Sequence, residues 1–288
     1  MHMTSTADRE AGDGSGPGGG RTARIAGSPP VWMLTGIVAV GAVSGLTATG
    51  PGPVPVIGAA AAVVVYGAVM RRAARRPVPE IARRGAGREA LLGGGIGLGF
   101  ILVSTVLITV LGGYSFSWAG HGFLSVLWSA LAVQTGAAVT EELMFRGLAL
   151  QALEQLWGSR VAVAVTGLFF GAAHLLNPGA SAWSGLAIAL EAGILLGAAF
   201  LWRRSIWFVV GLHLAWNTAE QLLGIPVSGH TPEGLFSVDV HGPALLSGGA
   251  FGLETSVVPV VIGVLLTVPM LVLARRSGGL RPRRRARR

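Results

Sequence analysis

Long apolar runs alternate with short polar stretches along most of the chain. Runs of roughly the 17 to 25 residues that a membrane-crossing helix requires predict eight spans, near residues 32–49, 54–70, 90–112, 122–140, 161–176, 184–202, 206–223 and 255–274. Because only helices and closed barrels satisfy the backbone within lipid, and the runs have helical length, we predict an all-α fold. The expected architecture is a polytopic transmembrane helical bundle of about eight spans.

The segments between these runs divide the chain into regions. Residues 1–30 are rich in Gly, Ser, Asp and Arg and show no apolar period, which predicts a disordered tail. The expected regions after this tail are N-terminal transmembrane helices with a basic loop at 31–112, a core of further spans at 120–225, a loop at 226–254, a last span at 255–274 and a basic tail at 275–288.

The distribution of arginine predicts the orientation of the spans. All 22 basic residues are Arg, and with the N-terminus inside, every one except Arg146 falls on the inner side of the expected spans. The loops near 113–121 and 224–254 carry no Arg. Since cytoplasmic loops hold the excess of basic residues, we predict a multi-pass cell-membrane protein with both termini cytoplasmic and the 226–254 loop extracytoplasmic.

Composition supports the membrane assignment and narrows the partners. Hydrophobic residues make up 51% of the chain and charged residues 12%, against about 25% charged in ordinary soluble domains. The net charge of +9 comes from arginines next to apolar spans, which indicates contact with anionic lipid of the bilayer rather than nucleic acid. The absence of Cys excludes disulfides, thiolate metal sites and a cysteine nucleophile.

A few ionisable residues lie inside the apolar runs, where such groups are costly and tend to mark function. Glu142 and Arg146 are four residues apart with the acid first, which favours an ion pair on a helix. Glu141 is rotated by about 100° from Glu142 on a helix. We therefore predict that Glu141 stays outside this pair and is free for chemistry.

Two other predicted helices supply further polar groups. His174 lies near the end of the fifth run, among small residues, and alone it would be compatible with a purely structural role. In the seventh run, His213 and Asn217 are one helical turn apart and share a face. Polar groups contributed by three separate spans are hard to explain by packing alone, and they predict a shared functional site within the membrane.

The chemistry that these residues favour is hydrolysis of an amide bond inside a water-containing cavity in the membrane. A Glu can act as general base toward water, and a neighbouring His can help to orient and deprotonate that water. His213 and Asn217 could donate hydrogen bonds to the tetrahedral oxyanion. No covalent nucleophile is required.

The polar motifs resemble the signatures of the CPBP family of CAAX proteases and bacteriocin-processing enzymes, which includes the Rce1-type CAAX prenyl endopeptidases. The motifs, in matching order and spacing, are Glu141-Glu142-x-x-x-Arg146, Phe170-x-x-x-His174 and His213-x-x-x-Asn217. The resemblance covers roughly residues 120–225 and implies an intramembrane endopeptidase. It implies that Glu141 and His174 activate water, that His213 and Asn217 form the oxyanion hole, and that Glu142 and Arg146 support the site.

The sequence leaves alternatives open. A zinc-dependent version would use Glu141, His174 and His213 as ligands, but we favour metal-free glutamic chemistry without a cofactor because Asn217 is a poor zinc ligand and a good donor. A carrier, with Glu191 and Glu220 as relay groups, is disfavoured by the lack of an internal repeat. A non-proteolytic scaffold or immunity protein on the same fold is the third alternative. The expected partner is a peptide or membrane-protein substrate of unknown sequence.

Overall fold

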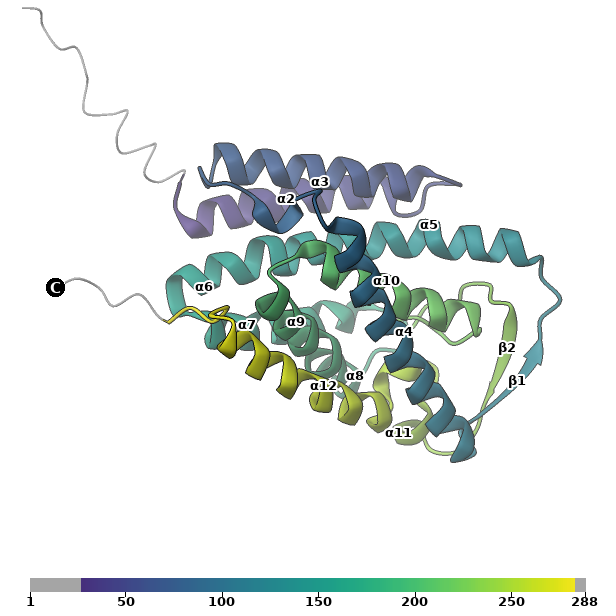
Figure 1. Cartoon of the computed structure of the whole chain (residues 1–288). Coiled ribbons are helices and arrows are strands. Elements are labelled where there is room, and N and C mark those ends of the chain that lie inside the picture. The colour runs from purple at the N-terminus through teal and green to yellow at the C-terminus, as the bar shows by residue number, and fades with distance from the viewer. Residues whose placement is uncertain (1–26, 283–288) are drawn as a thin grey trace, which may run out of the picture.

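The structure, a computed structural model, describes residues 27–282 and is mostly helical (Figure 1). Its main helical elements are α2 (Pro29–Thr47), α3 (Val54–Arg72), α4 (Ala86–Val110), α5 (Phe123–Glu142), η2 (Leu143–Leu150), α6 (Gln151–Trp157), α7 (Ser159–Ala173), α8 (Ala182–Ile188), η4 (Ala189–Ile194), α9 (Leu195–Arg203), α10 (Ile206–Leu222) and α12 (Val257–Arg276). Short elements are η1 (Pro79–Ile81), η3 (His174–Leu176), α11 (Ala244–Ser247) and η5 (Leu253–Thr255). The tail expected to be disordered lies outside the described residues except for 27–30, as do residues 283–288 of the basic tail.

Within residues 27–282, seven helices are long and apolar enough to cross a bilayer, which confirms a polytopic helical membrane protein. The segment predicted as span 206–223 is also helical, but α10 has only 17 residues. At 1.5 Å per residue α10 extends about 26 Å, one residue shorter than the shortest of the seven helices, Ser159–Leu176. It is largely buried, packed against α4 and α5, and its crossing of the bilayer stays a prediction.

The span predicted at 122–140 is longer than expected. α5 continues through η2 into α6, so that Phe123–Trp157 forms one helix of 35 residues. The middle of this helix, η2, is a π-helix. Such segments are rare and are frequently found at functional sites, and this one contains Arg146 and directly follows Glu142.

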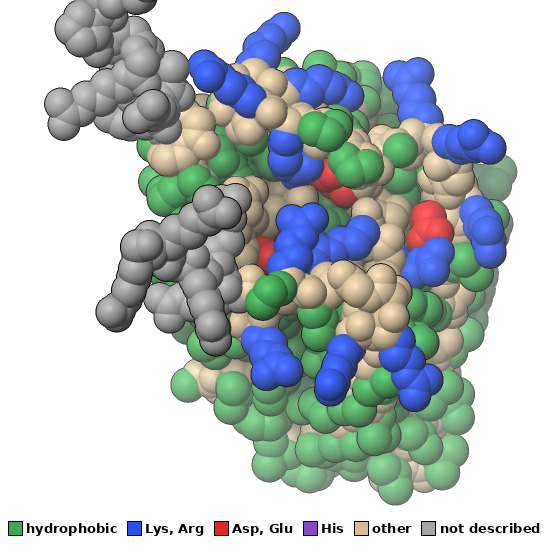
Figure 2. Space-filling view, turned by 60° about the vertical axis from the view of Figure 1, so that its left-hand side comes forward, with side chains coloured by type: hydrophobic (Ala, Val, Ile, Leu, Met, Phe, Trp, Pro, Cys, Tyr) green, Lys and Arg blue, Asp and Glu red, His purple; other side chains and the backbone are tan. Residues whose placement is uncertain are grey.

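Charge is distributed unevenly between the two ends of the bundle. Figure 2 shows Arg side chains gathered on the end that lies at left in Figure 1, whereas the two strands lie at the opposite end. The sequence predicts arginines on one side of the membrane and loops without arginine on the other, and the two ends of the bundle differ in this way. The assignment of the arginine-rich end to the cytoplasm stays a prediction.

A two-stranded sheet joins the loops at the end without arginines. β1 (Tyr114–Trp118) pairs antiparallel with β2 (Phe236–Val240), with Phe116 opposite Val238. The sequence analysis assigned only loops to these segments. Their pairing places the two predicted outer loops on the same side of the bundle, as the span order requires.

Glycines allow α10 to pack closely on α4. A Cβ atom on Gly97 would lie 2.1 Å from the carbonyl oxygen of Leu212, and one on Gly211 would lie 2.1 Å from that of Ala90. Small residues at helix interfaces let the backbones approach each other within membranes. This contact determines the position of α10, which carries His213 and Asn217.

Candidate active site

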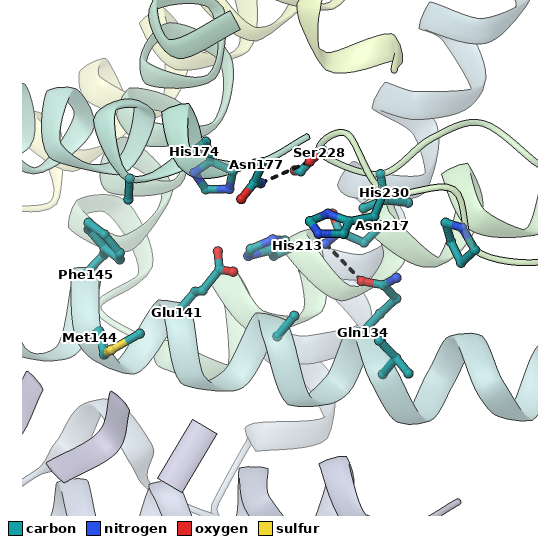
Figure 3. Close-up of a pocket in the computed structure, with 15 residues that line it drawn as sticks. Gln134, Glu141, Met144, Phe145, His174, Asn177, His213, Asn217, Ser228 and His230 are labelled. Atoms are coloured by element: carbon teal, nitrogen blue, oxygen red, sulfur yellow. Dashed lines mark hydrogen bonds between the residues drawn. The ribbon is translucent and has the colours of Figure 1, made fainter. Parts of the chain in front are cut away.

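A cavity of about 490 Å³ lies between α5, the end of α7, α10 and the loop that follows α10 (Figure 3). Its lining includes Glu141 from α5, His174 from η3 and two residues of α10, His213 and Asn217. The structure thus brings together all four side chains that the sequence analysis assigned to catalysis. Their catalytic roles stay predictions.

Glu141 is the acid that faces this cavity. It is half-buried, and its side chain points toward the imidazoles of His174 and His213 in Figure 3. Its Oε2 atom is buried without a hydrogen-bond partner among residues 27–282. Unpaired buried carboxylate oxygens are costly, so Glu141 has an unsatisfied acceptor next to the cavity.

Glu142, unlike Glu141, does not line the cavity but belongs to a fully buried ion-pair network. Its Oε1 accepts from Arg146 Nη1 at 3.0 Å, the predicted i,i+4 pair, and lies 2.9 Å from His213 Nδ1. Because a carboxylate oxygen can only accept, Nδ1 of His213 carries the proton in this contact. Glu142 therefore fixes the ring of His213, a link between α5 and α10 that the sequence analysis did not predict.

Arg146 extends this network to a second π-helix. Its Nη2 donates to the carbonyl oxygens of Ala192 and Gly193 in η4, at 3.0 and 3.1 Å. Its guanidinium also lies 4.6 Å from the centre of the Phe170 ring, a cation–π contact. Arg146 thus connects η2, η4 and α7, and the buried ring of Phe170 packs against its guanidinium.

His174 is oriented by the backbone of its own helix. Its Nδ1 lies 2.8 Å from the carbonyl oxygen of Phe170. The carbonyl accepts, so Nδ1 carries a proton, and in the neutral ring Nε2 has the lone pair. His174 can therefore accept a proton or a hydrogen bond at Nε2.

A chain of amides orients Asn217. Asn217 Nδ2 donates to Gln134 Oε1 at 3.2 Å, as drawn in Figure 3, and Gln134 Nε2 donates to Gln221 Oε1 at 2.9 Å. Gln221 Nε2 in turn donates to the carbonyl oxygen of Glu233 at 3.4 Å. Since the Asn217 amide has two N–H groups, one is used by Gln134 and the second remains for a ligand in the cavity.

The remaining wall of the cavity is a turn after α10. Val227 and His230 form a β-bridge around Ser228 and Gly229, which have positive φ angles of 48° and 83°. Three hydrogen bonds hold Ser228: its N and Oγ donate to Glu254 at 2.6 and 2.9 Å, and its carbonyl oxygen accepts from Asn177 at 3.0 Å. These contacts fix a turn whose residues Ser228 and His230 line the cavity.

Sequence reasoning missed Gln134, Asn177, Ser228 and His230 as lining residues. A signal existed for Gln134, because it precedes Glu141 by seven residues and shares its helical face. Gln221 likewise follows Asn217 by four residues on the polar face of α10. No comparable signal exists for Ser228 and His230, which reach the cavity through a loop.

The residues named for a zinc site do not form one in this structure. No group of three His, Asp or Glu side chains within the described residues could hold a metal ion. Nδ1 of both His174 and His213 is engaged by the protein. Glu141, His174 and His213 line one cavity, but they do not converge as a set of three ligands.

Glu191 and Glu220, the relay groups of the carrier hypothesis, lie elsewhere. Both are fully buried, and neither lines the 490 Å³ cavity. Glu191 is part of η4, close to Gly263 of α12. The cavity is therefore built without them.

Residues 122–219, about a third of the chain, match the family model described as type II CAAX prenyl endopeptidase Rce1-like. The match includes Glu141, Glu142, Arg146, His174, His213 and Asn217. No curated protein and no solved structure gives a significant match to the chain.

Proposed function

We propose that this chain is an intramembrane endopeptidase of the CPBP family that hydrolyses peptide bonds within the membrane, because residues 122–219 match the Rce1-like type II CAAX prenyl endopeptidase model. The observation that supports this most directly is that one cavity is lined by Glu141, His174, His213 and Asn217. They come from three elements, α5, η3 and α10, and Glu141 has an unpaired oxygen beside the cavity. The proposed substrate is a peptide or a segment of a membrane protein.

The proposed reaction starts with a water molecule held between Glu141 and His174. Glu141 accepts a proton from this water as general base, while Nε2 of His174 accepts its second hydrogen bond. The water oxygen attacks the carbonyl carbon of the scissile bond, and the carbonyl π electrons move to its oxygen. The resulting intermediate is a tetrahedral oxyanion.

We assign the stabilisation of this oxyanion to Asn217 and His213. The free N–H of Asn217 is a neutral donor whose orientation is fixed by Gln134. His213 can donate from Nε2 only as an imidazolium, because Nδ1–H already bonds to Glu142. The carboxylate of Glu142 stabilises this cation through a charge-assisted hydrogen bond.

The charges of this arrangement balance. Two carboxylates, Glu141 and Glu142, face two cations, Arg146 and the His213 imidazolium, so the cluster is formally neutral. A neutral cluster suits a low-dielectric interior better than an isolated charge does. When the oxyanion forms, the proton accepted by Glu141 keeps the total charge unchanged.

Collapse of the intermediate completes the hydrolysis. The C–N bond breaks as the proton held by Glu141 passes to the amide nitrogen, which leaves as an amine, and the carbonyl re-forms as a carboxylic acid. No covalent enzyme intermediate and no metal ion takes part in these steps. Glu141 returns to its carboxylate form.

The proposal is tested by exposing detergent-purified protein to a fluorogenic peptide library. Wild type is compared with Glu141→Ala and His174→Ala, each with and without a zinc chelator. Cleavage that both substitutions abolish and that the chelator does not affect supports the proposal. Chelator-sensitive cleavage that zinc restores would replace it by a metalloprotease mechanism, and no cleavage of any peptide would favour a scaffold or carrier.

A further inference from the structure

A second cavity, a groove at the arginine-rich end of the bundle, shares no lining residue with the candidate active site. It measures about 400 Å³ and runs between α7, α9 and α12. Most of its walls are aliphatic, including Ile194, Leu201 and Leu271. The only charged residues in its lining are Arg160 and Arg275.

These two arginines lie at the ends of membrane-spanning helices. Arg160 is the second residue of α7, and Arg275 is the penultimate residue of α12. Both helices have the length and apolarity to cross the bilayer. Their guanidinium groups therefore belong to the level of the lipid headgroups, where long basic side chains reach the interface.

The side chains of Arg160 and Arg275 have no ion-pair partner among residues 27–282, unlike two other arginines of this end. Arg204 and Arg281 at the same end are ion-paired with Glu154, at 2.6 and 3.5 Å. No hydrogen bond or ion pair joins the side chain of Arg160 or Arg275 to any residue of the described range 27–282. The groove therefore has two uncompensated positive charges at its mouth.

One end of the groove is closed by the segment after α12, which is hydrogen-bonded to the start of α7. The backbone N–H of Ser159 donates to the carbonyl oxygen of Arg281 at 3.0 Å, and the N–H of Arg281 donates to Ser159 Oγ at 2.7 Å. Arg204 also bonds to the carbonyl oxygen of Gly279. These contacts hold Leu280 as part of the wall.

The dimensions of the groove suit a lipid chain. Its wall extends from Ile194 to Leu201, about 10 Å along a helix. One leaflet of a bilayer core is about 15 Å thick, so the groove covers most of a leaflet. A soluble anion would use the arginines but not the aliphatic walls, whereas an uncharged lipid would leave both guanidinium groups unpaired.

We propose that this groove binds one anionic glycerophospholipid, with an acyl chain along the aliphatic walls and the phosphate between Arg160 and Arg275. Charge complementarity and the apolar walls both select this ligand. Basic pockets between transmembrane helices commonly bind anionic headgroups in this way. The inference does not depend on the proposed proteolytic activity.

The test is native mass spectrometry of the delipidated full chain in detergent. The protein is titrated with phosphatidylglycerol, with phosphatidylcholine of identical acyl chains, and with glycerol 3-phosphate. We expect one phosphatidylglycerol to bind more tightly than phosphatidylcholine. Arg160→Ala combined with Arg275→Ala should weaken that binding roughly 30-fold, as expected for two interfacial arginines.

Two matched controls separate a site from general attraction. Arg83→Ala combined with Arg84→Ala removes the same charge from an exposed loop of the same end and should leave binding unchanged. Ala164→Trp fills the groove and should prevent binding, whereas Val161→Trp on the exposed face of α7 should not.

Each remaining outcome overturns the proposal. Equal loss in both arginine pairs would mean diffuse electrostatic attraction, and equal binding of phosphatidylcholine would mean a lipid site that does not select for net negative charge. Binding of glycerol 3-phosphate as tight as that of phosphatidylglycerol would mean a soluble-anion site. Unaltered binding in Ala164→Trp would place the lipid elsewhere.

Discussion

His213 Nδ1 lies 2.9 Å from Glu142 Oε1, the same oxygen that accepts a hydrogen bond from Arg146. One buried carboxylate thus holds both a structural cation and a ring that lines the cavity. The two neighbouring acids differ in their surroundings: Glu142 is fully buried and its Oε1 is bonded to Arg146 and His213, whereas Glu141 lines the cavity.

Removing the charge of Glu142 should destabilise the fold strongly. Glu142→Gln leaves the guanidinium of Arg146, 1% exposed, without its counter-charge, and breaking a buried pair from one side costs about 3–5 kcal/mol. Thermal unfolding in detergent measures this loss. Replacing both partners, Glu142→Leu with Arg146→Met, should recover part of it because the guanidinium charge is removed together with the carboxylate, although His213 Nδ1 loses its acceptor.

The control for that comparison is the ion pair of Glu89 with Arg203, which is partly exposed. Glu89→Gln should cost about 1 kcal/mol or less. If Glu142→Gln unfolded at the same temperature as wild type, the buried network would not stabilise the protein.

Gln134 should act on catalysis through Asn217. Gln134→Leu removes the acceptor that orients the Asn217 amide, so we expect kcat to fall about tenfold with little change in KM. Asn217→Ala, which removes the oxyanion donor itself, should lower kcat by about 10²- to 10³-fold. Steady-state kinetics on the best peptide substrate separates the two effects.

A buried glutamine outside the cavity provides the comparison. Gln151 bonds to Tyr66 and to the carbonyl oxygen of Gly147, and Gln151→Leu should lower thermal stability but not kcat. Equal kcat in Gln134→Leu and wild type would show that Gln134 does not orient Asn217 for catalysis.

The turn at Ser228 should make stability depend on pH through Glu254. Burial raises the pKa of the Glu254 carboxyl above its ordinary value of 4.5, although the nearby His174 and the hydrogen bonds from Ser228 lower it. A pKa that is raised in the folded state contributes stability at low pH, which is lost as pH rises through the folded value.

We therefore expect the free energy of unfolding of wild type to fall, relative to Glu254→Gln, as pH increases above 4.5. Thermal unfolding of both proteins across this range gives the difference. A constant difference would show that Glu254 has the same pKa in the folded and unfolded states.

The close approach of α4 and α10 should not tolerate a side chain. Gly97→Val would place Cβ 2.1 Å from the Leu212 carbonyl oxygen, a backbone atom that cannot move aside alone. We expect lower thermal stability and lost peptide cleavage, since α10 carries His213. Gly99 lies on the same helix, and a Cβ added there would meet no atom within 4 Å, so Gly99→Val should cost far less.

The long helices could be predicted because apolar runs of bilayer length leave few alternatives. The site could be predicted in outline because ionisable groups such as Glu141 and His174 are rare within such runs. The separation of Glu141 from the Glu142–Arg146 pair follows from helical geometry alone, and the structure has that arrangement.

Other features depend on contacts between distant segments. The bond from His213 to Glu142 joins residues 71 positions apart, and the strand pair β1–β2 joins two five-residue segments with weak patterns of their own. Gln134 is harder to predict as a site residue, because a neutral amide within a span is a weaker sign of function than a charged group. α10 shows the remaining difficulty, since its apolar pattern does not reveal that this helix is largely buried between α4 and α5.

The most direct test of the account is kcat/KM of Glu141→Gln, a substitution that preserves size and removes the base. We predict a decrease of about 10²- to 10⁴-fold, the usual contribution of a general base, with an unchanged unfolding temperature because Glu141 makes no ion pair in the described structure. Glu233→Gln, in the loop after α10, should retain full activity. Activity of Glu141→Gln within threefold of wild type would contradict the central claim that this carboxylate activates the water.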